Sequence, residues 1–139
     1  MKNVLIILTN HGTLGTTDEA NGTFSPELTH ALHAFLAAGY RYDLVSIKGG
    51  NAPVYGVEMD DDQINSDVFK AEDLATKLAN TKKASDVNTD DYDAVFYPGG
   101  FGLLSDLAED ENVAKLTATL FENGAVVGAV CHGPAGLNI

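Results

Sequence analysis

The chain contains one cysteine, Cys131, and it follows directly on an apolar, valine-rich run at residues 126–130. A segment of small residues that could open a helix, residues 133–136, comes just after it. This order is typical of a nucleophile on a sharp strand-to-helix turn, which exposes the side chain. The amides and dipole of a following helix favour negative charge, and so favour the thiolate over the thiol. We therefore predict a cysteine nucleophile at Cys131; the alternative is a buried structural thiol.

Two further segments carry groups that could assist such a thiolate. His132 follows the cysteine and offers either its ring as a base or its backbone N–H to an oxyanion; the alternative is a turn histidine with its ring in solvent. Gly99 and Gly100 end another apolar run. Paired glycines let a ligand approach the backbone and leave N–H groups for an oxyanion, although the same residues also make plain turns.

Glu27 lies in the first turn of a helix that Ser25, as N-cap, and Pro26 are expected to begin. Its carboxyl group either complements the helix dipole or hydrogen-bonds the thiolate. Glu27, His30 and His33 recur at every third position, but this spacing spans nearly two turns and no further ligand is evident. We predict no metal site.

The apolar pattern predicts the elements that must position these groups. Near-continuous apolar runs are typical of parallel strands covered on both faces. Such runs occupy residues 4–8, 42–47, 94–97 and 126–130. The first helix should end at Gly39, and later helices should cover residues 71–80 and 112–122, the last with Gly124 as its stop. The side chains expected to face inward are Leu28, Leu32, Phe35, Leu36, Leu74, Leu78, Val113, Leu116, Leu120 and Phe121.

Strands that alternate with helices predict an α/β fold with a parallel sheet between helical layers. Ligands of such sheets bind beyond the carboxyl ends of the strands. His11, Lys48, residues 98–100 and Cys131 all follow strands, so we expect them at one edge. His11 is therefore a candidate substrate-binding residue, on one of two long loops, residues 10–24 and 48–62.

Composition limits the function. The chain has 139 residues and fits one domain. Its net charge of -12 disfavours nucleic acid and anionic lipid as partners. A single cysteine excludes an internal disulfide, which fits a reducing compartment, so we expect a cytoplasmic protein. The apolar run near the N-terminus is too short to span a membrane, and no cleavage site follows it.

Three motifs together resemble those of the PfpI superfamily. They are Ala-Val-Cys-His-Gly-Pro-Ala at residues 129–135, Tyr-Asp-Ala-Val-Phe-Tyr-Pro-Gly-Gly at residues 92–100, and Pro-Glu-Leu-Thr-His at residues 26–30. The superfamily has a class I glutamine amidotransferase-like, flavodoxin-type fold. The sequence is most similar to its heat-shock chaperone and glyoxalase III branch. This resemblance implies a flavodoxin-like three-layer sandwich with a mainly parallel central sheet.

The resemblance also implies roles. Cys131 would be the nucleophile, His132 its partner and Glu27 the acid that touches the cysteine, while Gly100 and His132 would supply oxyanion N–H groups. Gly99, Phe101, Gly133 and His11 complete the expected oxyanion and substrate-binding set. The thiolate would add to a 2-oxoaldehyde such as methylglyoxal, and proton transfer through an enediol would give a 2-hydroxy acid without glutathione, metal or another cofactor.

The chain departs from this branch in three ways. Residues 103–106, Leu-Leu-Ser-Asp, stand in a stretch where the branch normally has a bulky aromatic residue. Phe101 stands where the branch usually has histidine, in a part of the pocket that selects the substrate. The family also continues well beyond the nucleophile, whereas this chain ends at Ile139. We therefore expect residues 1–139 to form a single domain that lacks the C-terminal part of the family fold.

Other functions stay open. A holdase chaperone or redox-sensing stress protein would use exposed apolar surface and an oxidisable Cys131. An intracellular cysteine amidase or peptidase would use the same turn for acyl transfer, and an inactive remnant would use neither. The resemblance further implies unfolded or glycated proteins as partners, a protein deglycase role and a homodimer.

Overall fold

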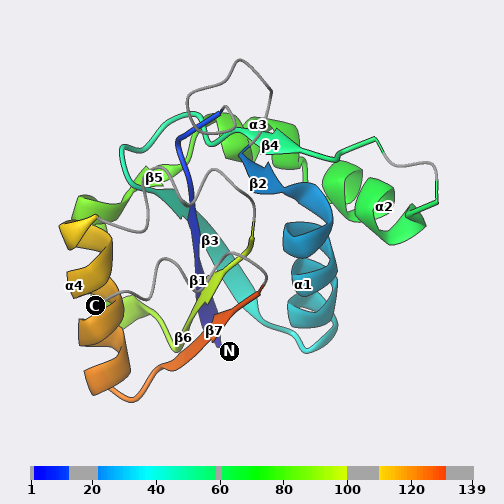
Figure 1. The fold of residues 1–139 in the computed structure, drawn as a ribbon. Helices are drawn as coiled ribbons and strands as arrows, with labels where there is room; N and C mark the ends of the chain where they lie inside the picture. The colour runs from blue at the N-terminus through cyan, green and yellow to red at the C-terminus, as the bar shows by residue number, and fades with distance from the viewer. Residues whose placement is uncertain (1, 13–21, 59–60, 100–109, 131–139) are drawn as a thin grey trace.

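A computed structural model of the chain describes residues 2–12, 22–58, 61–99 and 110–130. These residues form a parallel five-stranded sheet in the order β5-β3-β1-β6-β7 (Figure 1). Its strands are β1 (Asn3–Leu8), β3 (Arg41–Ser46), β5 (Lys82–Lys83), β6 (Ala94–Tyr97) and β7 (Val126–Ala129). The two-residue strands β2 (Thr23–Phe24) and β4 (Val54–Tyr55) pair in parallel as a second sheet.

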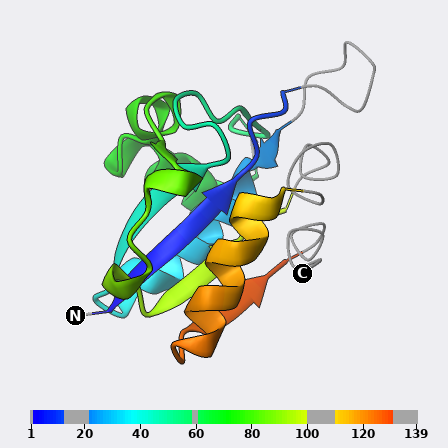
Figure 2. The ribbon, with the colours of Figure 1, turned by 90° about the vertical axis from the view of Figure 1, so that its left-hand side faces the viewer.

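Helices cover both faces of the five-stranded sheet. Figures 1 and 2 show α1 (Ser25–Ala37), α2 (Gln63–Ala71) and α3 (Leu74–Ala79) on one side and α4 (Glu111–Glu122) on the other. The short 3-10 turns η1 (Ala84–Asp86) and η2 (Thr89–Asp91) contact α4. The predicted three-layer α/β architecture with a parallel central sheet is therefore confirmed.

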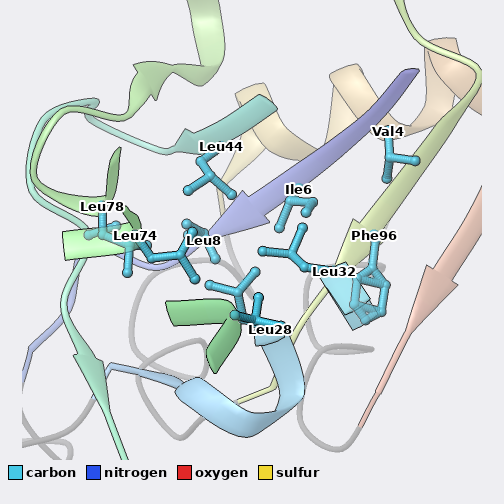
Figure 3. Packing of buried hydrophobic residues seen from close by; sticks show 11 residues of the cluster. Val4, Ile6, Leu8, Leu28, Leu32, Leu44, Leu74, Leu78 and Phe96 are labelled. Carbon is cyan, nitrogen blue, oxygen red and sulfur yellow. The ribbon is translucent and has the colours of Figure 1, made fainter. Parts of the chain in front are cut away.

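The central strand β1 supplies both cores. Val4, Ile6 and Leu8 face the layer that contains α1, whereas Leu5 and Ile7 face the layer that contains α4. All five side chains are buried. Figure 3 shows the first core, where the β1 side chains meet Leu28 and Leu32 of α1. Burial of successive residues on opposite faces explains why the run at residues 4–8 is apolar without alternation.

Gly39 ends α1 as the sequence predicts. Its φ of 80° lies in the left-handed region, where glycine meets no Cβ penalty. The N–H of Gly39 donates to the carbonyl of Leu36, and the N–H of Tyr40 donates to that of Phe35. The rings of Phe35 and Tyr40 stack 6.5 Å apart between their centroids. This is a Schellman cap with its usual apolar contact.

The prediction of a helix over residues 71–80 is confirmed in part. The short α3 lies within this range and buries Leu74 and Leu78 as predicted, but Ala71 belongs to α2. Glu72 and Asp73, whose φ is 50°, separate the two helices. The acidic residues before α2 look like loop, but Asp62 acts as its N-cap and accepts a hydrogen bond from the backbone N–H of Asn65. The start of α2 was therefore missed because its acidic N-cap belongs to a run of acidic residues that is also typical of loops.

Two side chains predicted to face inward do not. Leu36 is 37% exposed and Phe121 is 67% exposed. Both follow an inward position closely on their helices, and each further residue turns the side chain about 100° round the axis. The other predicted core positions of these helices pack as expected. The strands β2, β4 and β5 were not predicted, because two residues are too few to show a period.

Candidate active site

The predicted nucleophile segment lies outside the described residues. This holds for Cys131, His132 and Gly133, and equally for Gly100 and Phe101, so their roles stay predictions. The chain that leads to Cys131 is described. The ladder between β6 and β7 ends with Tyr97 opposite Ala129, and the N–H of Val130 donates to the carbonyl of Tyr97 at 3.1 Å. The residue before the cysteine is therefore held against the end of β6.

Gly99 is buried just beyond β6, and its carbonyl accepts a hydrogen bond of 2.8 Å from the N–H of Phe24. Phe24 is the N-cap residue of α1. The bond joins the end of β6 to the start of the helix that carries Glu27. Two predicted site elements, far apart in the sequence, are therefore brought together at the carboxyl edge of the sheet.

Glu27 has an unusual environment for a residue in the first turn of a helix. Its Oε2 atom is buried, and no donor among the described residues hydrogen-bonds to it. A buried carboxyl oxygen without a partner is destabilising, since the water it lost is not replaced. Complementing the helix dipole does not require a carboxyl oxygen to be buried without a hydrogen bond. The burial of Oε2 favours the functional interpretation of Glu27.

His11 follows β1 and is half-buried. Its backbone N–H donates to Oγ1 of Thr9 at 3.0 Å. The neighbouring Asn10 ties this segment to the loop after β3, because its side chain donates to Oγ of Ser46 and accepts from the N–H of Lys48. The loops that follow β1 and β3 are thus joined at the same edge of the sheet. A substrate-binding role for His11 stays a prediction.

Ser25 is not the N-cap that the sequence analysis predicted. It is the first residue of α1 and Phe24 takes the cap position; among the residues that the structure describes, no side chain caps the helix. The Ser25 hydroxyl instead donates to Oδ1 of Asn65 at 2.7 Å. The Ser25 hydroxyl therefore bonds the side chain of another helix, α2, instead of capping its own helix. The sequence analysis missed Asn65 because it assigned no element to residues 63–70; Asp62, as a possible N-cap, could have indicated the helix but not the packing of Asn65.

The histidines of α1 do not converge with Glu27. His30 places Nε2 at 2.8 Å from Oδ2 of Asp62, and His33 is exposed. Two hydrogen bonds lower the pKa of Asp62. The larger effect comes from the backbone N–H of Asn65 and the smaller from the His30 ring. Within the ranges that the structure describes, no group of three or more His, Cys, Asp and Glu side chains could hold a metal ion.

Two cavities lie at the other end of the sheet, around the first residues of β3. Their volumes are about 450 and 620 Å³, and both are lined by Arg41, Tyr42 and Asp43. Burial and the neighbouring Glu72 carboxylate raise the pKa of Tyr42. These cavities are remote from Gly99 and Glu27, because the strands run in parallel away from them.

The parallel sheet between helical layers, with the candidate site at the carboxyl edge of its strands, defines an α/β protein of the flavodoxin-like class. The family model for the DJ-1/PfpI family matches residues 19–138, and the chain belongs to that family. Glyoxalase 3 of Candida albicans is 34% identical over 146 residues, which cover 97% of this chain and 59% of that protein. Glutathione-independent glyoxalase HSP31 of Saccharomyces cerevisiae is 32% identical over 145 residues, covering 96% and 59%.

A solved structure extends the likeness to three dimensions. Rapid Encystment Protein 24 KDa of Francisella tularensis superposes with a TM-score of 0.89 at 32% identity, covering 99% of this chain and 61% of that one. The chain thus spans about 59% of the length of the two curated relatives. Among the described residues, no helix has the length and apolar character needed to cross a membrane.

Proposed function

We propose that this chain carries the catalytic elements of a glutathione-independent glyoxalase, with Cys131 as nucleophile and Glu27 and His132 as proton carriers. The observation that carries the proposal concerns Glu27, on a helix tied to the end of β6: its Oε2 atom is buried and has no hydrogen-bond partner among the described residues. Two relatives that match nearly the whole chain are named as glyoxalases, which supports the same reaction.

The proposed reaction begins when the Cys131 thiolate adds to the aldehyde carbon of a 2-oxoaldehyde and the new alkoxide takes up a proton, giving a hemithioacetal. A base removes the proton from that carbon and an acid delivers one to the neighbouring carbonyl oxygen, which forms an enediol. Reprotonation at the second carbon, with loss of the hydroxyl proton on the first carbon, gives a thioester of the 2-hydroxy acid. Water then cleaves the thioester and releases the acid and the thiol. The overall change adds one water and needs no external oxidant or reductant.

In this scheme Glu27 and His132 exchange protons with the two carbons and their oxygens. The backbone N–H groups of Gly100 and His132 would bind the oxyanion, and Gly99, Gly133, Phe101 and His11 would line the substrate site. Phe101 replaces the histidine that the glyoxalase branch usually carries. We therefore expect the substrate to be a small aldehyde with an apolar substituent.

The test is formation of 2-hydroxy acid from methylglyoxal by the purified chain without added thiol. Cys131→Ala should abolish it, and Glu27→Gln should lower kcat by about 100-fold, the usual range for a general acid or base. Glu122→Gln, on the exposed end of α4, is the matched control and should keep full activity. Product formation that persists in Cys131→Ala would overturn the proposal.

A second candidate function is the binding of unfolded proteins. Phe121 and Val126 are 67% and 70% exposed, and exposed apolar side chains are what the binding of unfolded chains requires. If this surface binds clients, Cys131→Ala would still suppress the aggregation of a denatured enzyme, whereas Phe121→Ser would not. The opposite pattern would exclude this function. Deglycase action on glycated proteins would instead depend on Cys131, as the glyoxalase reaction does.

The proposal includes a cytoplasmic homodimer without nucleic-acid or membrane partners, as the sequence analysis predicts. The net charge of -12 supports the exclusion of these polyanionic partners. Analytical ultracentrifugation of the chain would test the dimer. A single species at the monomer mass of 14.7 kDa across micromolar concentrations would contradict it.

A further inference from the structure

Asn65 is fully buried on α2, and its side chain uses every hydrogen-bonding position it has. Its Oδ1 accepts from the hydroxyls of Ser25 and Thr29, both at 2.7 Å. Its Nδ2 donates to the carbonyls of Gly56 at 2.9 Å and Val57 at 3.1 Å. An amide offers two acceptor and two donor positions, so this one is saturated. A saturated buried amide fixes the groups around it in one arrangement.

One side of this amide holds the start of α1. Ser25 and Thr29 are four residues apart and therefore lie on one face of the helix, with Glu27 between them in the chain. A second tie runs beside the first, because Asp62, the N-cap of α2, bonds the His30 ring. The first turns of α1 are thus fixed to α2 at neighbouring points. These are the turns that carry Oε2 of Glu27, which is buried without a hydrogen-bond partner in the described part of the chain.

The Nδ2 side of the amide holds the backbone of Gly56 and Val57, which lies against the Phe24 ring. Gly56 has a φ of 75°, and a Cβ built on it would lie 2.7 Å from Cε1 of Phe24. The Phe24 ring also packs on Tyr55, with 5.1 Å between the ring centroids. The N–H of Phe24 in turn donates to the carbonyl of Gly99. Contacts therefore run from Asn65 through Gly56 and Phe24 to the end of β6.

The hydrogen bond of the Ser25 hydroxyl to Asn65 indicates that the contact between α1 and α2 does more than pack the two helices together. A serine at the start of a helix ordinarily caps it, which stabilises a helix by about 1 kcal/mol. Here the hydroxyl donates to Asn65, and no side chain of the described ranges caps the helix start. The chain forgoes a local stabilising contact for one that orients α1 against α2.

We propose that Asn65 is a positioning residue for Glu27, holding the first turn of α1 in register with Gly99 at the end of β6. The proposal rests on the proposed function, in which Glu27 carries protons. Asn65 touches no substrate in this scheme and acts through the helix start. A carboxyl group displaced by as little as about 1 Å transfers protons poorly while the substrate still binds, so kcat should fall with little change in KM.

Two variants remove the hydrogen bonds of the Asn65 Oδ1 and Nδ2 atoms separately. Thr29→Val keeps the shape of the side chain and removes one bond to Oδ1. Asn65→Asp keeps the acceptor and removes the donors to Gly56 and Val57. We expect each to lower kcat on methylglyoxal by roughly 10-fold with KM within about twofold. Thr76→Val, on the exposed surface of α3, and Asn80→Asp, at its exposed C-cap, are the matched controls and should leave both constants unchanged.

A double-mutant cycle distinguishes positioning from general loss of structure. In a Glu27→Gln background, Thr29→Val should lower kcat no further, because the group it positions is already gone. An equal loss in both backgrounds would overturn the proposal. So would an unchanged kcat in a folded Thr29→Val. Circular dichroism and thermal unfolding identify the folded variants. If Asn65→Asp does not fold, Thr29→Val alone tests the proposal.

A second measurement does not depend on activity. In protein labelled with ¹³C at the glutamate carboxyl carbon, the Glu27 resonance is assigned from its absence in Glu27→Gln. Thr29→Val should shift this resonance, and Thr76→Val should not. If wild type forms no 2-hydroxy acid, the glyoxalase proposal fails, while a shifted resonance still supports the positioning role. An unshifted resonance in folded Thr29→Val would overturn that role whether or not the enzyme is active.

Discussion

The N–H of Phe24 and the carbonyl of Gly99 are joined by a hydrogen bond of 2.8 Å. Phe24 precedes α1, and Gly99 follows β6. The bond sets the distance between the helix that carries Glu27 and the strand end that leads into Gly100. Any change that moves Phe24 should therefore affect both the stability of the domain and the geometry of the candidate site.

Gly56→Ala tests this dependence. Gly56 and Gly39 both have a φ between 70° and 85°, so alanine is strained at either position by about 1 kcal/mol. Only at Gly56 would the new Cβ also meet a side chain, the Phe24 ring at 2.7 Å. We expect Gly56→Ala to lower the free energy of unfolding by at least about 1 kcal/mol more than Gly39→Ala, measured in urea. Equal losses would show that the Phe24 ring moves freely.

Leu32 and Leu36 test the corrected face of α1. Leu32 is fully buried against β1, and Leu36 is 37% exposed. Leu32→Ala should lower the free energy of unfolding by about 2–5 kcal/mol, because it opens a cavity in the core. Leu36→Ala should lower it by less than about 1 kcal/mol. Urea unfolding monitored by circular dichroism measures both, and similar losses would contradict the packing shown in Figure 3.

Asp62 should contribute to acid sensitivity. Hydrogen bonds from the Asn65 backbone and from His30 lower its pKa in the folded protein. A carboxyl group with a lowered pKa stabilises the fold above its unfolded pKa of about 4 and loses this effect as the pH falls further. Asp62→Ala should therefore be less stable than wild type at pH 7, and the difference should shrink below pH about 4. Asp61→Ala, at an exposed neighbour, is the control; an equal loss there would refute a specific role for Asp62.

Tyr97 should contribute to alkaline sensitivity. Burial raises its pKa to about 12, and its hydroxyl pairs with that of the buried Thr117. A raised pKa stabilises the fold below the unfolded value of about 10, and this contribution disappears as the pH rises toward 12. Tyr97→Phe should lower the free energy of unfolding at pH 7 by about 1–3 kcal/mol, since Thr117 loses its partner.

The loss of stability above pH about 10 should then be shallower in Tyr97→Phe than in wild type. Tyr40→Phe, at a partly exposed tyrosine, provides the comparison. Urea titrations at a series of alkaline pH values give the slopes. Parallel slopes for wild type and Tyr97→Phe would show that Tyr97 does not titrate in this range.

Apolar runs made the sheet predictable. Residues 94–97 form β6 as predicted. β1 and β7 differ from their predicted bounds by one residue at one end, and β3 is shifted by one residue at both ends. Such runs report burial on both faces, which is what a central parallel strand requires. The paired strands β2 and β4 carry no such signal, because they are held by backbone contacts such as that between Thr23 and Pro53.

The candidate site was predictable in part. Glu27 and Gly99 could be named because a helix start and a strand end are readable, and the structure ties their elements together. Asn65 could not be named, because its importance depends on where α2 packs. Its partners Ser25 and Gly56 lie in different segments, and one sequence does not show which of them meet. Cys131 and His132 lie outside the described residues, so their geometry stays a prediction.

The central place of β1 has a consequence for how the chain acquires its structure. Val4 pairs with Tyr42 on one side and with Ala94 on the other. During synthesis the first strand therefore leaves the ribosome long before its second neighbour exists. Until then its apolar residues stay open to association with other chains. Contacts of such long sequence separation make folding slow, so heat or rapid expression should divert newly made protein into aggregates before mature protein unfolds.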